Sequence, residues 1–77
     1  MQPNTPPNEQ SQFRFGEAMK KRRAQLGITQ EALAQIAEVS LRSIKALEKG
    51  TGNPTLNQLT KVFRVLGWDL ELKERGA

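Results

Sequence analysis

Basic side chains recur at helical spacing in the stretch VSLRSIKALEKG, residues 39–50. If this stretch is a helix, Arg42 and Lys45 lie on the face opposite the apolar Ile44 and Leu47. Arginine and lysine can donate hydrogen bonds to guanine O6 and N7, the acceptors that this base presents in the major groove of DNA. The pattern therefore predicts a short helix whose outer face has the chemistry to read bases.

Glu48 is placed unfavourably in the same predicted helix. It stands in the last turn, where the partial negative charge of the helix C-terminus disfavours an acid by a few tenths to about 1 kcal/mol. A carboxylate in this position needs a cation close by. We therefore expect a basic side chain from another element to lie beside Glu48.

The helix that positions these residues follows another one closely. Thr29 is a good N-cap for the preceding helix, Ser40 opens the basic helix and Gly50 ends it. Only AEVS joins the two, and so short a link predicts a sharp helix-turn-helix crossing. In that geometry the second helix enters the major groove with its N-terminal residues aimed at base edges. The outward positions, which we expect to read bases, are Ser40, Leu41, Arg42 and Lys45.

Two further helices are expected to complete the domain. One runs from about Phe13 to Leu26 before Gly27, and the other begins at the capping-box sequence 55–58 and stops at Gly67. The apolar stripes of the four helices are expected to form the core. Their members are Phe15, Ala18, Met19, Leu26, Leu33, Ile36, Ala37, Ile44, Leu47, Leu56, Leu59, Val62, Phe63 and Leu66.

Composition limits the function to a small basic module. The chain has 77 residues and a net charge of +4, and residues 13–27 alone carry five basic side chains against one acidic. This balance favours an anionic partner, although it also fits a solvated basic helix face. Without cysteine or histidine we expect no disulfide, metal or other cofactor, and no enzyme. An RNA or membrane-surface binder is less favoured, because no stacking platform or wide amphipathic face is visible.

The two ends of the chain differ from this middle part. Residues 1–12, with three prolines and many amides, predict a flexible tail. Residues 68–74 alternate apolar and polar side chains like a strand that has no partner strand in the chain. We expect this strand to pair antiparallel with a second copy across a two-fold axis. The dimerisation residues would be Trp68, Leu70 and Leu72, unless the segment merely tucks Trp68 against the helices.

The stretch from Leu26 to Gly67 resembles the Xre, or phage-repressor-like, helix-turn-helix family. The residues that carry the resemblance are Thr29-Gln30, Leu33-Ala34, Val39-Ser40, Ile44, Leu47-Glu48, Gly50 and Asn53-Pro54-Thr55. The resemblance covers roughly residues 15–67. It implies an all-α fold, a four-helix lambda-repressor-like domain over residues 13–67, followed here by the dimerisation strand 68–74.

The resemblance also implies roles for single residues. Gln30 and Ser43 would contact DNA phosphates, and Arg23 would form a buried ion pair with Glu48. Lys20 and Arg22 are further phosphate candidates because of their charge. One departure is Glu38, which occupies a turn position where the family usually has glycine. Either the turn differs slightly or the preceding helix is longer.

The C-terminal sequence KVFRVLGWDLELKERG is similar to the HipB-type antitoxins. That similarity implies a cytoplasmic, nucleoid-associated bacterial homodimer that binds a palindromic operator in double-stranded DNA, represses its own operon and binds a HipA-like kinase toxin. The alternative is a protein-interaction module that neutralises a partner protein with little or no specific DNA binding.

Overall fold

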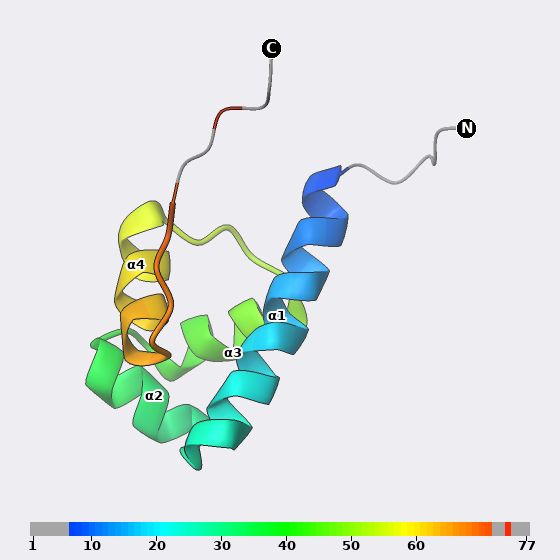
Figure 1. Cartoon of the computed structure of the whole chain (residues 1–77). Helices are drawn as coiled ribbons and strands as arrows, with labels where there is room; N and C mark the ends of the chain where they lie inside the picture. Colours follow the sequence, from blue (N-terminus) through cyan, green and yellow to red (C-terminus); the bar gives the residue numbers. More distant parts are fainter. Residues whose placement is uncertain (1–6, 72–73, 75–77) are drawn as a thin grey trace.

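The computed structural model describes residues 7–71 and residue 74, and within them the fold is all-α. Four helices follow in order: α1 (Pro7–Leu26), α2 (Gln30–Ala37), α3 (Leu41–Lys49) and α4 (Leu56–Val65) (Figure 1). α1 packs against α3, and α2 packs against both α3 and α4. The short α2 thus holds the other two short helices in place.

The first helix begins earlier than the sequence predicts. α1 starts at Pro7 rather than near Phe13, so residues 7–12 are helical where a flexible tail was expected. Proline is favoured at the first position of a helix, because its missing N–H would have no intrahelical partner there. The glutamate and glutamines that follow in the sequence are good helix formers. The first six residues of the predicted tail lie outside the described residues.

The other helix starts lie where the sequence places them. The hydroxyls of Thr29, Ser40 and Thr55 accept hydrogen bonds from the backbone N–H groups of Ala32, Ser43 and Gln58. The cap of α4 is a full capping box, since the Gln58 side chain also accepts from the Thr55 backbone. These contacts satisfy donors that a helix N-terminus otherwise leaves free.

The turn between α2 and α3 has left-handed geometry without a glycine. Glu38 adopts φ 61° and ψ 44°, the conformation that favours glycine. Its N–H donates to Gln35 O, and the N–H of Val39 donates to Ala34 O, which together form a Schellman motif. α2 is therefore not extended, and the turn keeps the geometry that glycine would adopt.

The core contains most of the predicted apolar residues. Met19, Leu33, Ile44, Val62 and Leu66 are fully buried. Four others that the sequence assigns to the core are exposed instead: Ala18, Leu26, Ile36 and Leu56. The buried faces of these helices are narrow, and these four residues lie at an edge or an end of their helix.

A close crossing of α1 and α3 occurs at Gly16. A Cβ atom there would overlap the backbone carbonyl of Glu48 and lie 2.7 Å from Leu47 O. Only a residue without a side chain allows the two helices to approach this closely. Gly16, Met19 and Arg23 share one face of α1, so this crossing also brings Arg23 towards α3.

The chain after α4 turns at Gly67 and runs back beside α4 (Figure 1). Residues 68–71 form no strand in the single chain, although a strand was expected over 68–74. Leu72 and Lys73, which belong to that prediction, lie outside the described residues.

Candidate nucleic-acid interface

α3 presents a row of cations to solvent. Arg42, Lys45 and Lys49 are exposed, and their spacing of three and then four residues places them on one side of the helix. Ile44 and Leu47 are buried on the opposite side. The row is about 10 Å long, from the rise of a helix per residue. It can therefore contact neighbouring bases and phosphates of one DNA groove.

The N-terminus of α3 lies next to this row and is held by two serines. Ser40 Oγ accepts from the Ser43 N–H at 3.0 Å and lies 2.9 Å from Ser43 Oγ. The Gln58 amide of α4 donates to Ser43 Oγ at 3.5 Å. The N–H of Ser43 is therefore already used by the cap. What Ser43 itself can still offer to a phosphate is its hydroxyl, which also accepts from Gln58.

Leu41 does not share the outward position of Arg42 and Lys45. It is partly buried and packs against the hydrophobic core. As the first residue of α3 it faces back towards the other helices, which the sequence-based assignment of four outward positions did not anticipate. The outward set that the structure brings together is Ser40, Arg42, Lys45 and Lys49.

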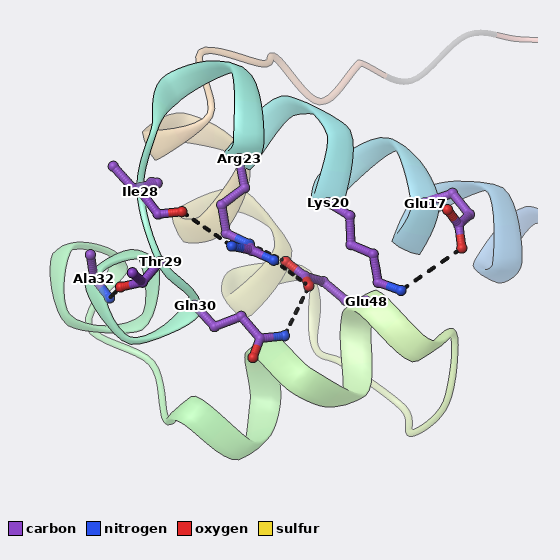
Figure 2. A network of polar contacts seen from close by, with 8 residues as sticks. All are labelled: Glu17, Lys20, Arg23, Ile28, Thr29, Gln30, Ala32 and Glu48. Carbon is purple, nitrogen blue, oxygen red and sulfur yellow. Dashed lines mark hydrogen bonds and ion pairs between the residues drawn. The ribbon is translucent and has the colours of Figure 1, made fainter.

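A network of charged and polar groups holds α3 against α1 and α2, on the side away from its exposed cations (Figure 2). Arg23 Nε donates to Glu48 Oε2 at 2.7 Å, and Arg23 Nη2 donates to Glu48 Oε1 at 3.1 Å. Gln30 Nε2 donates to the same Oε1 at 2.9 Å, and Arg23 Nη1 donates to Ile28 O. The network thereby joins α1, α2 and α3 at a single carboxylate whose side chain is 1% exposed.

The electrostatics of this network explain how an acid is tolerated in the last turn of α3. The bidentate guanidinium of Arg23 supplies the cation that the position requires. The hydrogen bond with Glu48 raises the pKa of Arg23 above its ordinary value, while burial acts in the opposite direction. Because this pKa is raised rather than lowered, the Arg23 guanidinium holds its proton at least as firmly as an ordinary arginine side chain does. This charge is therefore present throughout the neutral range.

The other two basic residues predicted on α1 lie elsewhere. Arg22 is half-buried, and its Nε donates to Leu66 O at 2.9 Å, at the C-terminus of α4. A cation is favourable beside the free carbonyls of a helix end. Arg22 thus connects α1 to α4, and its assignment as a phosphate ligand stays a prediction. Lys20 is exposed on α1, with its Nζ 3.9 Å from Glu17 Oε2.

The sequence of these helices matches a known family of proteins. The helix-turn-helix family matches residues 19–72, from the middle of α1 to beyond α4. The chain belongs to the helix-turn-helix family. A relative described as an uncharacterized HTH-type transcriptional regulator, from Methanothermobacter thermautotrophicus strain Delta H, is 41% identical over 49 residues. The aligned part covers 64% of this chain and 71% of the relative.

In this helix-turn-helix protein α2 and α3 form the motif itself, separated by the three residues 38–40. α3 corresponds to the helix that such motifs insert into the major groove. Among the described residues no group of three or more acidic, histidine or cysteine side chains could hold a metal ion. Of the helices in residues 7–71, none is long and apolar enough to cross a bilayer.

Two of the predicted dimerisation residues, Trp68 and Leu70, lie in the segment that follows α4. Trp68 is half-buried and packs edge-on against Phe63, with ring centroids 5.4 Å apart. Leu70 is 43% exposed. Much of the Trp68 surface is therefore covered by its own chain. This agrees with the alternative expectation that the segment tucks Trp68 against the helices. Leu72 lies outside the described residues.

Two residues that shape this interface were missed by sequence reasoning. Lys49 shares the outward row of α3, and its spacing from Arg42 and Lys45 was visible in the sequence. Gly16 sets the helix crossing, and a glycine inside an otherwise helical pattern is itself a sign of close packing. Its neighbour across the crossing could not be known from the sequence.

Proposed function

We propose that this protein is a sequence-specific transcriptional repressor that reads the DNA major groove with α3. The observation that carries the proposal is the exposed row Arg42, Lys45 and Lys49 on a helix braced from behind by a buried ion pair. A rigid support matters because base readout depends on holding donors within hydrogen-bond distance of the base edges.

Each residue of the interface has a chemical role in this proposal. Arg42 and Lys45 donate to guanine O6 and N7, and Lys49 neutralises a phosphate farther along the groove. Gln30 keeps one amide N–H free after donating to Glu48, and this N–H donates to a phosphate. The hydroxyls of Ser40 and Ser43, at the N-terminus of α3, contact the phosphate backbone of the DNA. Lys20 adds a phosphate contact from α1.

The proposed active form is a homodimer on a palindromic operator. One chain supplies one recognition helix, whereas helix-turn-helix repressors gain specificity from two half-sites related by a two-fold axis. Residues 68–74, with Leu70 and Leu72, contribute to the contact between copies. The exposure of residues 69–71, which belong to no helix, supports this.

We further propose that the protein is an antitoxin of the HipB type. It represses its own operon in the cytoplasm, on nucleoid DNA, and binds a HipA-like kinase toxin. The similarity of the C-terminal sequence to such antitoxins supports this role. A stable complex with a kinase encoded beside this gene would support it further, whereas free chains after co-expression would contradict it.

Fluorescence anisotropy with the DNA upstream of the gene and a scrambled duplex tests the proposed DNA readout. We expect Arg42→Ala and Lys45→Ala each to lose about 1–3 kcal/mol of binding free energy for the upstream DNA, since a good base contact contributes that much. This is roughly a 5- to 150-fold rise in Kd. Binding to the scrambled duplex should be weak and should fall steeply as salt is added.

Lys61→Ala is the matched control, because it removes the same charge from α4 rather than from α3. If both α3 variants bind the upstream DNA as tightly as the unaltered protein, α3 does not read bases. A protein-interaction module that neutralises a partner would then be the better description.

A further inference from the structure

A groove between α4 and the returning C-terminal segment is not used by the proposed DNA interface. It has a volume of about 420 Å³. Its walls come from α4 on one side and from residues 68–70 on the other, and they are Leu56, Thr60, Phe63, Arg64, Trp68, Asp69 and Leu70. Phe63 and Trp68 close its floor by their edge-on contact.

Two leucines of this groove are left open to water. Leu56 is 68% exposed and Leu70 is 43% exposed. They are the apolar rim of the groove. A chain of this size buries only about 60% of the surface that its unfolded form exposes, so it gains from covering such a patch with a partner.

The charges beside the groove suit a copy of the same surface. Arg64 lies on α4 and Asp69 on the returning segment, both exposed, and neither forms an ion pair within the described part of the chain. A two-fold axis through the groove would bring residue 64 of one copy to residue 69 of the other, twice. A self-complementary pair of this kind is what an isologous contact requires.

The backbone of the returning segment is also open. Among the described residues no backbone–backbone hydrogen bond involves residues 69–71. Such a segment can still add its donors and acceptors to another chain. Apolar rim, opposite charges and open backbone therefore lie together on one side of α4.

We propose that a second copy of this chain occupies the groove, so that α4 and residues 68–71 of each copy pack against the same elements of the other. Arg64 faces Asp69 of the partner subunit, and Leu56 and Leu70 are covered. The proposal rests on the homodimer proposed above. It extends the contact from the C-terminal segment to α4.

Charge reversal with mixing tests this arrangement on the full chain. Arg64→Glu and Asp69→Arg each place two like-charge pairs in their own homodimer. Sedimentation equilibrium should therefore show a dimer Kd raised at least about 10-fold for each variant alone, because the two like-charge pairs together are unfavourable by at least about 1.4 kcal/mol. In a mixture of the two variants both cross-contacts are again oppositely charged, and we expect dimers with a Kd near that of the unaltered chain.

Mixing separates this contact from one within the chain. An attraction between Arg64 and Asp69 of the same chain cannot be rescued by adding the other variant. A mixture that stays as monomeric as its components overturns the proposal, as does a dimer that neither substitution weakens.

A pair of apolar substitutions gives a second measure. Leu56→Asn should raise the dimer Kd, whereas Ile36→Asn, at a residue 60% exposed on α2 and outside the groove, should not. If the unaltered chain is dimeric and neither substitution matters, the groove proposal fails while the proposed homodimer stands. If the unaltered chain is monomeric with and without operator DNA, the homodimer itself fails.

Discussion

The contact of Arg23, Gln30 and Glu48 shows how one buried acid can organise the recognition helix. A buried ion pair adds little net stability, because both charges lose their hydration, but removing one partner leaves a costly unpaired charge. Here all three side chains are hydrogen-bonded at one carboxylate. The helix that carries Arg42 and Lys45 is therefore held in one orientation relative to α1 and α2.

Glu38 has a left-handed backbone conformation that is unfavourable for a residue with a side chain. Its left-handed conformation costs a non-glycine residue about 1–2 kcal/mol. Glycine would remove that cost, but it would also make the unfolded chain more flexible, which destabilises the fold by roughly 0.4–1 kcal/mol. We expect Glu38→Gly to stabilise the fold by about 0.5–1 kcal/mol, measured by urea unfolding followed by circular dichroism.

Glu38→Ala is the control for the Glu38→Gly comparison. Alanine removes the carboxylate but keeps the Cβ atom, so the backbone cost remains and no stabilisation is expected from this source. Equal stabilities of the two variants would mean that the carboxylate, rather than the left-handed backbone, sets the stability at this turn.

At the scale of elements, the crossing of α1 over α3 decides where Arg23 lies. The crossing is as close as the backbone allows, with Gly16 against the carbonyls of Leu47 and Glu48. In an isolated helix alanine would be favoured over glycine by about 1 kcal/mol. In this fold, however, the new methyl group would meet backbone atoms, which cannot move aside like a flexible side chain.

We therefore expect Gly16→Ala to lower the free energy of unfolding by at least about 1 kcal/mol, since overpacking typically costs 1–3 kcal/mol. Urea unfolding measures this change. Ala18→Gly, at an exposed position of the same helix, is the matched comparison and should lose about 1 kcal/mol through helix propensity alone. A stabilised Gly16→Ala variant would show that α1 and α3 are not in such close contact.

For the whole molecule, the proposed DNA readout and the proposed dimer use different elements. The outward row of α3 is formed by Arg42, Lys45 and Lys49, whereas the groove is formed by α4 and residues 68–70. Dimerisation can therefore join two recognition helices without covering either. The operator should then contain two half-sites about one helical turn apart, with centres separated by roughly 10 base pairs.

Inserting five base pairs between these half-sites tests the geometry of the dimer on DNA. The insertion rotates one half-site to the other side of the duplex, so both helices cannot bind at once. We expect anisotropy titrations to show a loss of roughly 100-fold in affinity, which is the gain that a second linked contact provides. Equal affinities for the two duplexes would mean that one chain binds alone.

The sequence was sufficient for features that depend on neighbouring residues. The hydroxyl caps at Thr29, Ser40 and Thr55 were predicted correctly, because a cap joins groups within one helical turn. The helix-turn-helix motif followed from the short link between two such helices. The partner of Glu48 was implied by the family resemblance, and its need for a cation followed from the helix dipole.

Features that depend on residues far apart in the chain required the folded structure. Ile36 and Leu56 continue apolar stripes in the sequence but are exposed, because the width of a buried face is set by the helices packed against it. Arg22 could serve a phosphate by its charge, yet it binds the end of α4, 44 residues away. Local chemistry fixes the three short helices and their caps, whereas only packing decides which helix faces remain for DNA or for a second copy.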